Sequence, residues 1–201
     1  MPAETIRLHL SAREGDVPTG PVDCDALVMT SPAGETWIGR RGKRGPPRLA
    51  GRIFVLAIDL NGSLAGPDTS GILSCSVAPP TDRRVLLRVD RILLKAGSIT
   101  PRHRHLGPGI RLLTAGALDA MVGCRRFPVR PGEAWLEAVD DDIIGRVVGE
   151  EPASFIRFVL LPPELDGGRS SFVAVAPRKG DPEDAPFERE QTILAEALLD
   201  L

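Results

Sequence analysis

The chain has 201 residues, of which 42% are hydrophobic and 26% charged, and these ordinary proportions exclude a chain that stays disordered. Its 25 basic and 27 acidic residues give a net charge of -2, so nucleic acid is not an expected partner. No stretch approaches the eighteen uninterrupted apolar residues of a membrane-spanning helix, and the length favours one structural domain.

The three cysteines and the N-terminal segment indicate a cellular compartment. Cys24, Cys75 and Cys124 lie far apart, form no CxxC pair and leave an odd cysteine over, which fits a reducing compartment. Residues 1–16 carry charges throughout and lack the apolar core of a signal peptide. The sequence therefore predicts a cytoplasmic protein without a membrane association.

Nineteen prolines and twenty-one glycines divide the chain into short apolar runs, too short for typical helices. These runs are rich in Val, Ile, Leu and Phe, which favour strands, and several strands of this kind predict a sandwich or barrel. In chain order the expected strands are residues 26–30, 35–38, 52–60, 72–78, 84–95, 109–114, 117–122, 133–139, 144–148, 154–161 and 171–176.

The C-terminal segment 191–201, QTILAEALLDL, is the main helix candidate. Ala, Glu and Leu favour helix, and the apolar residues of this segment fall at helical spacing. Those residues are Ile193, Leu194, Ala197, Leu198 and Leu201. A strand is the alternative.

Two histidines stand at i and i+2 in the segment 97–116, GSITPRHRHLGPGIRLLTAG. Because side chains alternate along a strand, His103 and His105 share one face. In a closed barrel that face is either the lumen or the outside, and two imidazoles that converge in a lumen can hold a divalent transition metal.

The glycines around this pair extend the pattern, since Gly97 precedes His103 by six residues and Gly116 follows His105 by eleven. This arrangement resembles the first motif of the cupin family. The segment PGEAWLEAV, which begins at Pro131, is similar to the opening of the second cupin motif. The resemblance covers roughly residues 85–165.

The resemblance implies an all-β fold, a cupin-type jelly-roll β-barrel with N-terminal extra strands and a short C-terminal helix or strand. Residues 81–165 are then the barrel core. Residues 1–80 are an N-terminal elaboration packed on the barrel, and residues 166–201 are a C-terminal strand and tail. All three parts are expected to form one structural domain.

Cupins bind iron, manganese, nickel, zinc or copper through three histidines and one glutamate, and this chain matches that set only in part. His103 and His105 align with the two histidines of the first motif, whereas the position of the glutamate falls on Gly109 and that of the last histidine on Ile143. We therefore expect low occupancy by Fe, Mn, Zn or Ni at His103 and His105, because water would fill most of the coordination sphere.

Nearby carboxylates could replace the missing ligands. Asp140, Asp141 and Asp142 directly precede Ile143, and Glu137 lies earlier on the same predicted strand. Aspartates in a turn more often hydrogen-bond their own backbone or face water, so the turn is the favoured interpretation.

Arg111 and Trp135 complete the predicted ligand-binding set with His103 and His105. Arg111 follows Gly109 by two residues and so shares its face; it either points into the barrel, where it would bind a carboxylate or phosphate, or reaches solvent. Trp135 either lines the lumen or fills the core, and core filling is favoured.

These residues support three functional hypotheses, with catalytic residues unknown. In the first, the barrel binds a small, anionic molecule beside an incomplete metal site. The alternative is a metal-dependent cupin enzyme of the dioxygenase or isomerase type, in which other carboxylates rebuild the ligand set. The third is a structural homodimer with an inert lumen, and a homodimer is the expected oligomer in any case.

Overall fold

The computed structural model describes residues 5–15, 22–45, 51–60, 71–81, 84–182 and 186–200. These residues form three five-stranded sheets in which every strand pairing is antiparallel, and no α-helix occurs among them. One 3-10 turn, η1 (Pro163–Leu165), follows the longest run of strands. The prediction of an all-β fold is confirmed.

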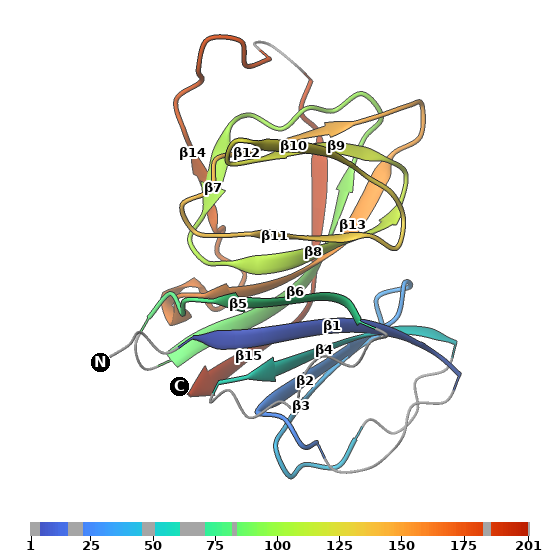
Figure 1. The fold of residues 1–201 in the computed structure, drawn as a ribbon, viewed down its shortest axis with the longest axis vertical. Coiled ribbons are helices and arrows are strands. Elements are labelled where there is room, and N and C mark those ends of the chain that lie inside the picture. The colour runs from blue at the N-terminus through green and yellow to red at the C-terminus, as the bar shows by residue number, and fades with distance from the viewer. Residues whose placement is uncertain are drawn as a thin grey trace.

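Eight consecutive strands form a jelly roll (Figure 1). One sheet has the order β11-β8-β13-β6 and the facing sheet the order β10-β9-β12-β7, so the chain passes between the two sheets at every step except the β9–β10 hairpin. This strand order is that of two Greek keys wound into a double-sheet jelly roll. The strands are β6 (Arg84–Leu94), β7 (His103–His105), β8 (Gly109–Ala115), β9 (Leu118–Val122), β10 (Arg125–Val129), β11 (Ala134–Glu137), β12 (Ile143–Val147) and β13 (Ala153–Leu161).

Two C-terminal strands extend this jelly roll, one on each sheet. Strand β14 (Phe172–Ala174) pairs with β7, and β15 (Arg189–Asp200) pairs with β6. Of the two alternatives for residues 191–201, the strand is confirmed and the favoured helix is wrong as far as Asp200; Leu201 lies outside the described residues. A β-bulge between Ile193 and Ala195 interrupts the two-residue alternation of β15, which is why its apolar residues imitate helical spacing.

The third sheet is N-terminal and has the order β3-β2-β4-β1-β5. The sequence did not predict β1, because its charged residues obscured the alternation in which Ile6, Leu8 and Leu10 are buried. The strands are β1 (Ile6–Glu14), β2 (Ala26–Thr30), β3 (Thr36–Arg40), β4 (Arg52–Asp59) and β5 (Gly71–Val77).

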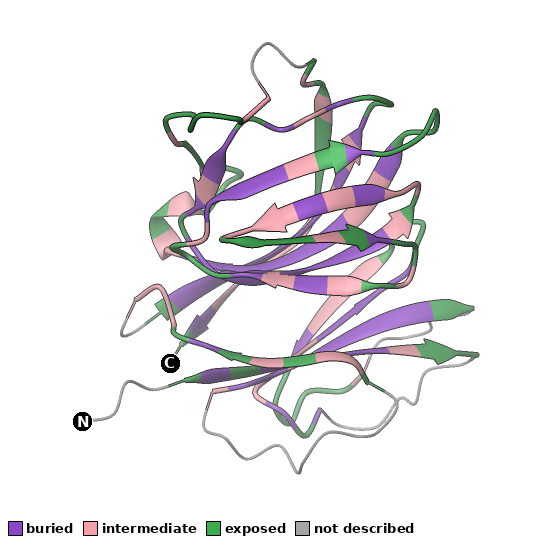
Figure 2. Cartoon of the chain, turned by 45° about the horizontal axis from the view of Figure 1, so that its top comes forward, coloured by how far each residue is buried: buried purple, intermediate pink, exposed green. Residues whose placement is uncertain are grey.

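The sheet β11-β8-β13-β6-β15 is the middle layer of the molecule (Figure 1), and its central strands β8, β13 and β6 are buried on both faces (Figure 2). In β8, Ile110 and Leu112 face the N-terminal sheet, whereas Leu113 packs in the jelly-roll interior. Strand β13 follows the same alternation, with Phe158 on the outer face. Strands covered on both faces read as continuous apolar runs, and this explains why their positions were clear from the sequence.

The remaining differences from the predicted strands concern weak signals. The short strand β7 and the edge strand β10 were not predicted; β10 contains Pro128, which only an edge strand tolerates. Cys24, Cys75 and Cys124 form no disulfide bond. In the described part of the chain, no helix has the length and apolar character needed to cross a membrane.

Candidate functional site

A cavity of about 50 Å³ lies between the two jelly-roll sheets, with room for about four water-sized groups. Apolar side chains from both sheets form most of its wall, together with several charged and aromatic side chains. The lining residues are Ile92, Leu94, Thr100, His103, His105, Arg111, Leu118, Ala120, Trp135, Glu137, Ile143, Ile144, Gly145, Phe155, Arg157, Phe172, Phe187 and Arg189.

Four polar or aromatic side chains form a row across the middle sheet. Trp135 lies opposite Arg111, Arg111 opposite Arg157, and Arg157 opposite Asp90, on the strands β11, β8, β13 and β6. Directly opposed residues on neighbouring strands share a face, so the register alone brings two arginines side by side in the lumen. Arg111 has no exposed surface.

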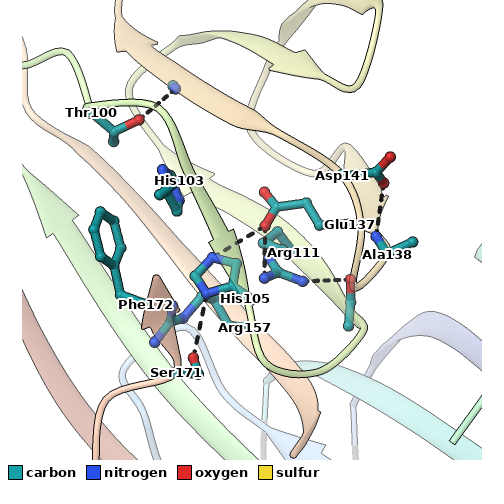
Figure 3. Close-up of polar contacts among 12 residues, drawn as sticks. Thr100, His103, His105, Arg111, Glu137, Ala138, Asp141, Arg157, Ser171 and Phe172 are labelled. Atoms are coloured by element: carbon teal, nitrogen blue, oxygen red, sulfur yellow. Dashed lines mark hydrogen bonds and ion pairs between the residues drawn. The ribbon is translucent and has the colours of Figure 1, made fainter. Parts of the chain in front are cut away.

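Arg111 is paired with Glu137 in the lumen (Figure 3). Arg111 Nη2 lies 2.7 Å from Glu137 Oε2, Arg111 Nη1 donates to the Gly109 carbonyl at 2.6 Å, and Trp135 Nε1 donates to Glu137 Oε1 at 2.8 Å. The angles between Arg111 Nη2 and Glu137 Oε2 are not those of a hydrogen bond, so this contact is an ion pair only. Within the described residues, Nε and Nη2 of Arg111 and Oε2 of Glu137 are thus buried without a hydrogen-bond partner. Burial lowers the pKa of Arg111 to about 10, which the charge of Glu137 opposes.

Arg157 is held by a second carboxylate behind the cavity wall. Its Nε and Nη2 each donate to Asp90 at 2.6 Å, in the bidentate geometry that suits a guanidinium and a carboxylate. Gln191 Nε2 also donates to Asp90, at 2.8 Å. The charge of Arg157 is therefore balanced within the sheet.

Both histidines of β7 face the cavity, with ring centroids 5.0 Å apart. His103 Nδ1 lies 2.8 Å from the Pro101 carbonyl. A carbonyl only accepts, so Nδ1 carries the proton and Nε2 is left as an acceptor. His105 contacts Ser171 Oγ through Nδ1 at 3.3 Å and Glu137 Oε2 through Nε2 at 3.4 Å (Figure 3).

Both imidazoles are neutral at pH 7. Burial lowers the pKa of His103, against the opposing effect of the Pro101 carbonyl. Burial also lowers the pKa of His105, well below its ordinary value, and the nearby charges of Arg111 and Arg157 add to this effect.

An aromatic stack lies at the side of the cavity reached by the C-terminal strands. The ring of Phe172 stacks on His103 with centroids 4.4 Å apart, and Phe187 stacks on Phe172 at 6.4 Å. The guanidinium carbon of Arg189 lies 5.1 Å from the Phe172 centroid and 5.9 Å from the Phe187 centroid. These are cation–π distances.

The structure also shows where Gly109 and Ile143 lie, the two residues at positions where the cupin motifs have metal ligands. A Cβ on Gly109 would lie 2.3 Å from the Phe158 carbonyl oxygen, so no side chain fits there. Its partner on the neighbouring strand is Glu137, which brings a carboxylate to the lumen from a different strand. Ile143 lines the cavity opposite His103.

The three aspartates before Ile143 do not line the cavity. Asp141 accepts a hydrogen bond from the Ala138 amide at 2.8 Å, as the turn interpretation predicts. Asp142 is buried in ion pairs with Arg104 and Arg178, each at 2.6 Å. The positions of these aspartates therefore do not favour them as replacements for the missing metal ligands.

The donor set of the lumen does not fit a divalent metal ion. A metal bound between His105 and Glu137 would need the Oε2 atom of Glu137 as a ligand. That oxygen lies 2.7 Å from Nη2 of the positively charged Arg111, which would repel a metal cation. Across the described ranges, no group of three or more His, Cys, Asp or Glu side chains is placed to hold one metal ion.

Several lining residues escaped the sequence analysis. Arg157 and Arg189 were not considered, and Phe172 was placed only within a predicted strand. Arg157 did carry a signal, since it is the one charged residue of the apolar strand ASFIRFVLL. Asp90 carried the same kind of signal in β6. An acidic residue in a strand buried on both faces needs a buried partner.

Comparisons with known proteins yield structural neighbours only. Protein-family models give no match to the sequence, and curated proteins give none either. An oxalate decarboxylase from Bacillus subtilis, an enzyme with Mn(II) centres, is 10% identical with a TM-score of 0.40, covering 78% of this chain and 63% of its own length. An oxalate decarboxylase from Lactobacillus farciminis, solved as a formate complex, is 11% identical with a TM-score of 0.42, covering 86% and 73%. This chain thus spans under two thirds of the Bacillus protein's length. Similarity of this size supports no further argument, and the jelly roll rests on the strand order.

Proposed function

We propose that this protein is a cupin-like barrel that binds a small anionic molecule in its lumen without using a metal ion. The observation that supports it best is the cavity that Arg111, Arg157 and Arg189 line beside two neutral histidines. Buried guanidinium groups recognise carboxylates and phosphates. His103, His105, Arg111 and Trp135 are the proposed ligand-binding residues.

The size and lining of the cavity support a small, partly apolar ligand. A volume of about 50 Å³ admits a molecule of only a few non-hydrogen atoms. Concave sites with mostly apolar walls and a few convergent polar groups are typical of small-molecule sites. His103 Nε2, an acceptor, adds a position for a hydrogen-bond donor of the ligand.

A fluorescence titration tests this proposal. The chain has two tryptophans, so a Trp37→Phe background leaves Trp135, which lines the cavity, as the only indole reporter. Titration with acetate, propionate and butyrate should change its emission in a saturable way. Metal analysis of the same purified sample should find less than stoichiometric transition metal; tightly bound iron or manganese required for propionate binding would contradict the proposal.

A filled-cavity variant supplies the control. Ala120→Leu adds a larger side chain to the lining of the cavity, whereas Ala174→Leu adds the same atoms at an exposed position of β14. Ala120→Leu should abolish the titration signal while the protein still melts cooperatively, because the new methyl groups occupy empty space. Ala174→Leu should titrate like the parent.

A metal-dependent cupin enzyme with a rebuilt ligand set is the second candidate. It is favoured by the hydrogen bond from His103 Nδ1 to the Pro101 carbonyl, because metal-binding histidines usually donate their other ring N–H to a carbonyl or carboxylate. Replacing both His103 and His105 by Ala should then abolish uptake of added manganese without unfolding the barrel. Equal metal content in the parent and the double variant would remove this candidate.

A further inference from the structure

Three guanidinium groups face the cavity, and only two carboxylates balance them. Arg111 is paired with Glu137, and Arg157 is paired with Asp90. Arg189 forms no salt bridge with any carboxylate of the described ranges; its guanidinium lies instead over two aromatic rings. Among these arginines and carboxylates, one positive charge is therefore unbalanced.

Arg189 differs from the other two arginines in its exposure. Arg111 and Arg157 are buried, whereas Arg189 is of intermediate exposure at the first residue of β15. Burial lowers the pKa of Arg189, and the neighbouring charge of Arg157 lowers it further, so a bound anion would relieve both effects. The aromatic rings of Phe172 and Phe187 hold the guanidinium plane without using its N–H donors.

We infer that the ligand is a small monocarboxylate whose carboxylate binds the Arg189 guanidinium beside Phe172 and Phe187, with its apolar end in the cavity. This inference rests on the proposed function and names its ligand class. One unbalanced charge selects a monoanion over a dianion, because a second carboxylate would be buried without a cation. The lining also includes the apolar side chains of Leu94, Leu118 and Phe155, which suit a short alkyl chain.

The test compares three probes of similar size in the Trp37→Phe background at constant ionic strength. Propionate is the monoanion, malonate the dianion and propionamide the neutral analogue. Propionate should bind at least about tenfold more tightly than either of the others. A hydrogen bond to a charged group contributes about 1.4 kcal/mol, which corresponds to a factor of ten in affinity.

A pair of arginine variants tests the position of the carboxylate. Arg189→Gln should weaken propionate binding by about tenfold or more and leave propionamide binding unchanged. Arg125→Gln is the matched control, because Arg125 also lies over a phenylalanine ring, at 5.7 Å from Phe127, but outside the cavity lining. Should Arg189→Gln fold poorly, the side-chain Nε–H resonance of Arg189 in the parent protein should shift on addition of propionate.

The outcomes separate this inference from the proposed function. Unchanged propionate binding by Arg189→Gln, or an Nε–H resonance that does not move at saturation, would overturn the role of Arg189 while the lumen site stands. Malonate or propionamide binding as tightly as propionate would overturn the ligand class alone. If none of the three probes changes the Trp135 emission of the parent, the proposed function falls and this inference with it.

Discussion

At the scale of single residues, the charges of the lumen are held by partners on neighbouring strands. Glu137 stands between Arg111, Trp135 and His105, and each of the three contacts one of its carboxylate oxygens. Buried charges are costly unless paired, so each of these side chains depends on the others for its stability. Among the described residues, Nε and Nη2 of Arg111 have no hydrogen-bond partner.

Removal of the Glu137 charge should destabilise the protein strongly. Glu137→Gln keeps an acceptor for Trp135 but leaves the buried Arg111 guanidinium without a counter-charge, and the loss should be about 3–5 kcal/mol of unfolding free energy. Urea denaturation measures it. The exposed Glu151→Gln should change stability by less than about 0.5 kcal/mol. In the double variant Glu137→Gln, Arg111→Met much of the loss should be recovered; additive losses would show that the pair is not coupled.

The buried histidines should make the protein less stable in weak acid. The pKa values of His103 and His105 are lowered in the folded state, so between those values and the ordinary value near 6.5 the unfolded chain binds more protons. Stability is then complete above about pH 6.5 and falls as the pH decreases, by up to about 1.4 kcal/mol per pH unit for each histidine. Urea denaturation at several pH values between 7 and 5 measures the slope. His105→Gln should reduce it.

At the scale of elements, the sequence predicted the strands that are buried on both faces better than those at edges. Strands β6 and β13 were placed within one residue because their apolar runs are long and end at polar or glycine-rich segments. Strand β15 was interpreted first as a helix, because a local bulge is set by its pairing with β6 and cannot be read from its own residues. Alternation predicted that His103 and His105 share one face, but whether that face points inward was left open and only the structure decides it. The position of Arg189 depends on the pairing of β15 with β6.

Two substitutions in β15 distinguish the strand from the predicted helix in solution. Leu199 is buried against the core between the barrel and the N-terminal sheet, although it is not on the apolar face of the predicted helix. Leu199→Ala should cost about 2–5 kcal/mol of unfolding free energy. Ile193 lies on that predicted helical face but is 38% exposed, and Ile193→Ala should cost much less. The reverse order of the two losses would contradict the strand.

At the scale of the whole molecule, the N-terminal sheet and the jelly roll share one core. Ile6, Leu8 and Leu10 of β1 pack with Leu87 and Phe158 of the middle sheet. The cavity lies on the opposite face of that middle sheet, so the N-terminal strands support the row from Trp135 to Asp90 from behind. Apolar residues of the N-terminal sheet thus help to position the side chains that line the cavity.

A chain shortened to residues 81–201 tests that dependence. Without the N-terminal sheet, the outer apolar face of the middle sheet would meet water, and exposed apolar patches of this kind drive association. We expect the fragment to aggregate in light scattering and to bind 1-anilinonaphthalene-8-sulfonate, whereas the full chain should give a single species whose mass also tests the predicted homodimer. A monodisperse fragment that melts at the temperature of the full chain would show instead that the barrel is stable alone. In that case the N-terminal sheet would not support the lumen, and the jelly roll alone would hold the row from Trp135 to Asp90 in register.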